Sequence, residues 1–131
     1  ILLSAFFFLI KLSCAQYSLS FCENVTAEGR PQKVSNLFSG SGNGSLIKLF
    51  ITADGQFNTD QLKFTIYFIN SEGNEEEISK LPQKIESSWN YAWKEVVLFD
   101  QGTYRVKVYS GNGKYLTSSN LNLKHFEKLR N

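Results

Sequence analysis

The sequence predicts an all-β protein, an antiparallel β-sandwich of about seven strands. Short runs that alternate apolar and polar residues recur along the chain, and clusters of Gly, Asn and Ser separate them. No stretch keeps a helical apolar period long enough for a crossover helix, which argues against a βαβ architecture. The 131 residues, of which 42% are hydrophobic, suffice for one domain with a core and are too apolar for a disordered chain.

The expected strands follow one another through the central part of the chain. Their ranges are 17–22, 45–52, 61–70, 78–88, 89–99, 103–110 and 114–124. The range 45–52 places Ile47, Leu49 and Ile51 on one face, because side chains alternate along a strand. The range 61–70 alternates most regularly and is the clearest strand in the sequence.

The connections between these strands are predicted from turn residues and charge. The acidic stretch 71–77 is expected to be a solvated turn whose charges discourage edge pairing. Pro82 marks 78–88 as a short, interrupted edge strand, since proline cannot donate to a sheet ladder. The "GNG" at 111–113 is expected to join the last two strands in a hairpin.

The N-terminus has the pattern of a secretion signal. Residues 1–10 carry no charge and are too few to span a bilayer, which is typical of the apolar region of a signal peptide whose first part is missing. Two kinds of processing fit the segment that follows. Small residues at Ser13 and Ala15 suit an ordinary signal peptidase that cuts before Gln16.

The alternative is a bacterial lipobox, which "LSC" resembles, with Cys14 as the lipidated first residue. Cleavage is preferred, because Lys11 occupies a lipobox position that is normally apolar. Either way we expect an exported protein that is periplasmic, cell-surface or secreted. Its expected parts are a signal peptide at 1–15, a β-sandwich domain at 16–124 and a C-terminal tail at 125–131.

Both kinds of processing leave Cys22 as the one cysteine of the mature chain, so no internal disulfide is expected. Cys22 lies in an apolar, strand-like run with Leu19 and Phe21, which predicts a buried thiol that acts as a small hydrophobe. A thiol nucleophile would need a histidine partner, and the only histidine is His125 in the polar tail. That pairing is not expected.

The stretch "FDQGTYRVKVY" predicts a structural corner. Tyr104, Val106 and Val108 share one face of a strand, and Asp100 and Gly102 lie just upstream, where the chain must turn sharply. Gly102 allows a positive φ, and Asp100 can hydrogen-bond its own turn. A tyrosine at this point can bury its ring and return its hydroxyl to the backbone, an arrangement called a tyrosine corner. The motif is therefore interpreted as structural.

Residues 100–108 resemble the corner strand of immunoglobulin-like and fibronectin-III-like domains. More loosely, 17–124 is similar to the small exported immunoglobulin-like modules of bacterial envelope proteins, notably those of the Bacteroidetes. The resemblance implies that Val106 takes the place of the immunoglobulin cysteine, and that the domain serves as a binding, spacer or accessory unit. The chain departs from that pattern in lacking the cysteine pair and a Trp in 61–70.

Catalytic, metal and nucleic-acid sites are not expected. One His and one mature Cys exclude most zinc and Cys–His sites, and no Gly-x-Ser-x-Gly is present. Asp54, Asn58 and Asp60 supply oxygen donors without the spacing of a calcium loop. Fourteen basic and twelve acidic residues give a net charge of +2 with no basic run that would follow a phosphate backbone. We therefore expect no enzyme and no cofactor.

The stretch "WNYAW" is the one candidate binding surface. In an extended strand Trp89, Tyr91 and Trp93 would share one face and could stack on the sugar rings of a glycan. The alternative is that this face supplies the core, while Asn90 and Ala92 face solvent. The core interpretation is preferred, because the intervening residues are mostly polar or small.

These observations predict a non-catalytic, extracytoplasmic binding or assembly module of the cell envelope. Its partner is expected to be a protein or glycan at the cell surface, and no membrane span is expected in the mature chain. The alternatives are a carbohydrate-binding accessory module that uses the aromatic face and, less favoured, a hydrolase built on carboxylates.

Overall fold

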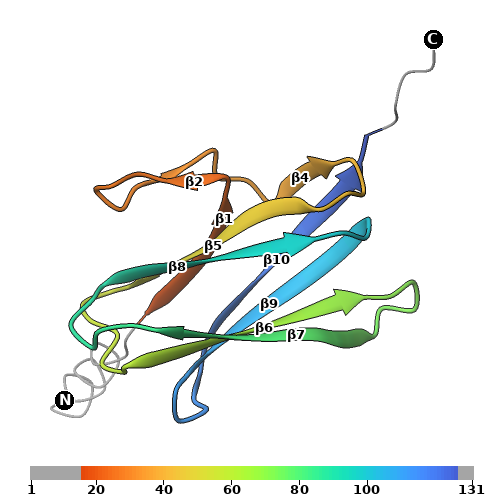
Figure 1. The fold of residues 1–131 in the computed structure, drawn as a ribbon. Coiled ribbons are helices and arrows are strands. Elements are labelled where there is room, and N and C mark those ends of the chain that lie inside the picture. The colour runs from red at the N-terminus through yellow and green to blue at the C-terminus, as the bar shows by residue number, and fades with distance from the viewer. Residues whose placement is uncertain (1–15, 127–131) are drawn as a thin grey trace, which may run out of the picture.

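The computed structural model describes residues 16–126, and every regular element among them is a β-strand. Figure 1 shows the strands stacked as two layers. They are β1 (Tyr17–Cys22), β2 (Asn24–Val25), β3 (Pro31–Gln32), β4 (Leu37–Gly40), β5 (Ser45–Ala53), β6 (Gln61–Ile69), β7 (Glu75–Lys84), β8 (Tyr91–Leu98), β9 (Gly102–Ser110) and β10 (Tyr115–His125). The predicted all-β sandwich is confirmed, with more strands than the seven expected.

The first sheet contains three antiparallel strands in the order β1-β5-β8. The central strand β5 pairs Leu49 with Phe21 of β1 on one side and with Lys94 of β8 on the other. Ile47, Leu49 and Ile51 are buried on its inner face, as the alternation of 45–52 predicts. The outer strands β1 and β8 are the edges of this sheet.

The second sheet contains five strands in the order β4-β10-β9-β6-β7. All neighbours are antiparallel except β4, which runs parallel to β10. Leu62, Phe64 and Ile66 of β6 are buried on its inner face, which agrees with the regular alternation of 61–70. The expected hairpin around residues 111–113 is present, since β9 and β10 pair on either side of it.

Strand β7 differs from the prediction in two ways. Glu75–Glu77, expected in a turn, begin the strand instead, and the turn is confined to the residues before them. Pro82 does not interrupt the strand. The Ile85 N–H donates to the Asp60 carbonyl at 3.0 Å, so strand alternation aims the nitrogen of Pro82 away from β6. On that open edge a missing N–H breaks no ladder bond.

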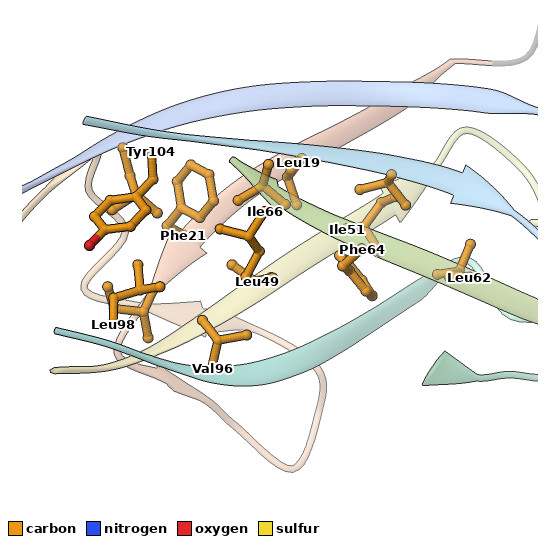
Figure 2. Packing of buried hydrophobic residues seen from close by; sticks show 14 of the residues in the cluster. Leu19, Phe21, Leu49, Ile51, Leu62, Phe64, Ile66, Val96, Leu98 and Tyr104 are labelled. Atoms are coloured by element: carbon orange, nitrogen blue, oxygen red, sulfur yellow. The ribbon is translucent and has the colours of Figure 1, made fainter. Parts of the chain in front are cut away.

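One hydrophobic core lies between the two sheets. Figure 2 shows buried side chains from both sheets pointing toward one another, among them Leu19, Phe21, Leu49, Ile51, Phe64, Ile66, Val96 and Leu98. Removing this apolar surface from water is the main force that holds the layers together. Every strand of four residues or more contributes a buried side chain to this cluster except β7, whose Leu81 is only partly buried against it.

The tyrosine corner is confirmed. Tyr104 is 2% exposed, and its hydroxyl donates a hydrogen bond of 2.5 Å to the backbone carbonyl of Asp100. Its ring meets Phe68 edge to face at 5.2 Å between centroids. Gly102 has a φ of 151°, and a side chain there would lie 2.7 Å from the Phe68 ring. Val106, next on this inner face, is fully buried.

Candidate binding site on strand β8

The three candidate aromatic residues are at the surface. Trp89, Tyr91 and Trp93 are 44%, 37% and 40% exposed, so the preferred core interpretation is wrong. Ala92 points inward and pairs with the buried Ile51. The small Ala92 side chain packs on the inner face of β8, and the rings of Tyr91 and Trp93 lie on the outer face.

Only two of the three aromatic residues, Tyr91 and Trp93, lie on strand β8. Trp89 precedes β8, because the strand begins at Tyr91. Tyr91 stacks on the buried Phe50 of β5, with 6.0 Å between ring centroids and 27° between planes. Trp93 carries the Lys48 ammonium over its ring, 5.5 Å from the centroid. Tyr91 and Trp93 therefore each contact a side chain of β5.

The β2–β3 hairpin packs on the same outer face of the first sheet. Gly29, in its turn, has a φ of 81° and lies so close to Tyr91 that a Cβ atom would overlap the tyrosine ring. Cys22 is fully buried beside Lys48, and its Sγ lies 3.9 Å from the Lys48 carbonyl oxygen. Burial raises the pKa of the Cys22 thiol, so the prediction of a buried, unreactive thiol is supported.

A hollow opens along β8. It has a volume of about 700 Å³ and is lined by Gln83 of β7, by Trp89 and Asn90 of the connecting loop, and by residues 91–95 of β8. We call this hollow the β8 groove. Its walls combine aromatic and apolar side chains with a few polar groups, the composition typical of ligand sites.

The charges along the groove are unequally compensated. Glu95 on the outer face forms an ion pair of 3.1 Å with Lys48. Lys94 is half-buried on the inner side of β8 and forms no ion pair with any residue from 16 to 126. The groove therefore presents one positive charge without a carboxylate beside it.

A second polar cluster lies on the outer face of the five-stranded sheet. Glu75 of β7 lies 3.2 Å from both Arg105 and Lys107 of β9, and the Lys107 ammonium sits 4.7 Å from the Tyr67 ring centroid. The hydrogen bond from Lys107, followed by that from Arg105, lowers the pKa of Glu75. Because its charges compensate one another, this cluster is best explained as cross-strand stabilisation.

The described residues contain no group of three or more His, Cys, Asp or Glu side chains placed to hold a metal ion. They also include no helix long and apolar enough to cross a membrane. The ring of His125 contacts the Phe99 carbonyl at 2.6 Å, so it is held at the end of β10. The predicted signal peptide and the Cys14 lipidation site lie outside the residues that the structure describes.

A solved structure with a similar fold is an immunoglobulin-like protein from Pseudomonas aeruginosa, with a TM-score of 0.54 at 10% sequence identity. The alignment covers 86% of this chain and 98% of that one. The fold is immunoglobulin-like. No protein-family model matches the sequence, and no curated protein is significantly similar to it. At this identity the likeness concerns the fold alone. It agrees with the immunoglobulin-like fold that the resemblance of residues 100–108 implied.

Sequence reasoning missed four residues of this site. They are Lys48 and Phe50 of β5, Gly29 of the β2–β3 hairpin and Gln83 of β7. All four lie far from Trp93 in the sequence, and only strand pairing and sheet packing bring them near it. A signal did exist at Gly29, because a glycine in a polar hairpin often marks a close approach.

Proposed function

We propose that the chain is a non-catalytic, extracytoplasmic binding or assembly module of the cell envelope, which recognises its partner through the β8 groove. The observation that carries the proposal is the exposure of Trp89, Tyr91 and Trp93 beside a hollow of about 700 Å³. Large apolar rings held at a surface are costly to leave in water, and partner binding covers them.

The preorganisation of the site supports the same role. Tyr91 is stacked on Phe50 and Trp93 lies under Lys48, so little side-chain freedom is lost when a ligand binds. Trp89→Ala and Trp93→Ala should therefore abolish ligand binding while far-UV circular dichroism stays unchanged. Tyr115→Ala is a matched control, because Tyr115 is 52% exposed on a different strand, β10. Loss of binding in the control alone would contradict the proposal.

A glycan is a specific candidate ligand. Tyr91 and Trp93 are neighbours on one face of β8, about 6.5–7 Å apart along the strand, which is comparable to the repeat of sugar rings in a glycan chain. Titration with soluble envelope glycans, followed through Trp fluorescence, tests this. Protection of the tryptophans from acrylamide quenching would support a glycan as the ligand. If no glycan changes the quenching, a protein is the remaining candidate partner.

The extracytoplasmic location is part of the proposal and rests on the apolar stretch at residues 1–10 and the small residues before Gln16. Mass spectrometry of the processed protein should find Gln16 at the N-terminus. A diacylated or triacylated Cys14 would instead make the chain a lipid-anchored module, similar in that respect to bacterial envelope modules of the Bacteroidetes type.

The carboxylate-based hydrolase is the alternative of another class. Hydrolysis of a glycan or peptide by the purified protein, lost when one carboxylate such as Glu95 is changed to Gln, would replace the binding role by catalysis. We expect no hydrolysis in this assay.

A further inference from the structure

The edge of β8 carries unpaired backbone groups. Ala53 N–H donates to the Asn90 carbonyl at 2.8 Å, so Asn90 and, by strand alternation, Ala92 and Lys94 direct their polar backbone groups toward β5. Tyr91, Trp93, Glu95 and Val97 direct theirs the opposite way. No strand within residues 16–126 pairs with that side. Each of these four residues therefore offers one N–H and one C=O to an incoming strand.

The sheet opposite extends one strand beyond β8. β1 is in contact with β10 across the sandwich. Following the two strand orders from that pair places β5 opposite β9 and β8 opposite β6. No strand of the described part of the chain then lies opposite β7. Burial agrees with this count. Ser79, Leu81 and Gln83 share the inner side of β7 with the buried residues of β6, yet all three are only half-buried. Figure 1 shows β7 and β8 as the outermost strands of their layers, joined by a loop.

We propose that the β8 groove is a strand-addition site, in which an extended segment of a partner protein pairs with the free edge of β8 and covers the inner face of β7. This inference rests on the proposed binding role of β8 and specifies the class of partner. Main-chain hydrogen bonds to the edge would give affinity, and side chains at alternate positions would enter the groove. Residues 91–95 span about 13 Å, which a five-residue strand matches.

Because β7 projects beyond β8, the free edge of β8 can accept a single extended segment more easily than a second copy of this chain. If a second copy paired its β8 with the β8 edge of the first copy, the β6 strand of the second copy would lie beneath its own β8. That space is already occupied by β7 of the first copy. A lone extended segment has no second layer and meets no such obstacle. The occupant is therefore a strand supplied by a flexible part of another protein.

The walls of the groove predict the sequence of that segment. Gln83, Ala92 and the uncompensated Lys94 line the inner side of the groove. Leu81 lies next to Gln83 on the inner face of β7, so we expect the segment to carry apolar inward residues with one carboxylate placed at Lys94. Its outward side chains lie beside Tyr91 and Trp93, which favours β-branched or aromatic residues there. The partner segment thus alternates in polarity and carries an acidic residue.

The test begins with a phage-displayed library of random nine-residue peptides selected on the purified protein. The tightest binder is then synthesised in two forms, each with N-methyl groups on one alternate set of amides. In one form the methylated amides face β8, and this form should lose affinity by roughly three- to tenfold for each hydrogen bond removed. In the other form the methylated amides face away from β8, and this form should keep its affinity. Equal binding by both forms would exclude strand pairing, and the absence of any selected peptide would overturn the proposal.

Amide hydrogen exchange gives a second readout that needs no mutation. The selected peptide should slow exchange at Tyr91, Trp93 and Glu95, while Lys94, already bonded to β5, should change little. A glycan stacked on the rings would not produce this alternation. If glycans protect the tryptophans and no peptide is selected, strand addition fails and the proposed binding role stands; if neither ligand binds, both fail.

The charge prediction is tested by reversal. Lys94→Glu should weaken the acidic peptide at least tenfold, and exchanging the peptide carboxylate for lysine should restore binding. Lys63→Glu is the matched control, since Lys63 is exposed on the outer face of β6 and should have no effect. Self-association that depends on Trp93 and that the peptide does not disrupt would show instead that a second copy occupies the edge.

Discussion

At the scale of single residues, Tyr104 combines a buried ring with a hydrogen bond that closes the turn before β9. Tyr104→Phe keeps the ring and removes the hydroxyl that bonds the Asp100 carbonyl, so we expect a loss of about 1 kcal/mol in the free energy of unfolding. Tyr104→Ala also empties a core site and should cost about 3–5 kcal/mol. Urea unfolding measures both changes.

The control for Tyr104 is Tyr17→Phe, because the Tyr17 hydroxyl forms no hydrogen bond with any residue from 16 to 126 although its ring stacks on Phe57. This variant should unfold within about 0.5 kcal/mol of the parent. A Tyr104→Ala protein of parental stability would disprove the corner assignment.

Two glycines provide a matched test of the hairpin contact. Gly29 and Gly73 have φ values of 81° and 85°, so alanine should cost about 1–2 kcal/mol at each from backbone strain. At Gly73 the added methyl meets nothing within 4 Å, whereas at Gly29 it overlaps the Tyr91 ring. Gly29→Ala should therefore be the more destabilising change by thermal unfolding. Equal losses would show that the hairpin does not pack on Tyr91 in solution.

At the scale of elements, Glu75 links strands β7 and β9. Its pKa lies below the ordinary 4.5, chiefly because Lys107 donates a hydrogen bond to its carboxylate. A lowered folded-state pKa stabilises the protein above the unfolded value of about 4.5, and this contribution is lost as the pH falls through the folded-state pKa. Carboxyl-carbon NMR titration should show Lys107→Gln raising the pKa of Glu75 more than Arg105→Gln does.

The placement of the rings on β8 predicts the fluorescence of the protein. Trp89 and Trp93 are the only tryptophans and are 44% and 40% exposed, so acrylamide should quench the folded protein strongly. Trp89→Phe and Trp93→Phe should each remove part of the signal and leave the fold intact. Blue-shifted emission that acrylamide barely quenches would show that the rings are buried in the core and would contradict the β8 groove.

At the scale of the whole molecule, both sheets contribute to one hydrophobic cluster. We therefore expect residues 16–126 to unfold in a single cooperative step. Trp fluorescence reports on the β8 region of the three-stranded sheet, and far-UV circular dichroism reports on all strands. The two denaturation curves should superimpose, and separate midpoints would show that the sheets unfold independently.

The two outermost strands of the five-stranded sheet, β4 and β7, have no strand from the described residues opposite them when β1 is set opposite β10. On one side β4 pairs with β10 and leads directly toward β5. On the other side β7 lies uncovered and β8 is unpaired. The β8 groove lies on this second side, where an added strand would cover the half-buried inner face of β7.

The local pattern of the sequence determined most of the strands and the corner. Alternation at 45–52 correctly predicted that Ile47, Leu49 and Ile51 share one face of β5, because side-chain direction alternates in any strand. The sequence around Tyr104 determined its corner, because that hydrogen bond spans only four residues. It failed at β7, where glutamates at an exposed edge lie in a strand because β6 pairs with them.

The tertiary structure alone decided where the candidate binding site lies. Alternation places Ala92 and Trp93 on opposite faces of β8, but it does not say which face is inside. The packing of Ala92 beside Ile51 made that choice. Likewise Lys48, Gln83 and the free edge of β8 became a site only through strand order and the count of strands in each sheet. These are long-range contacts, which no local period in the sequence encodes.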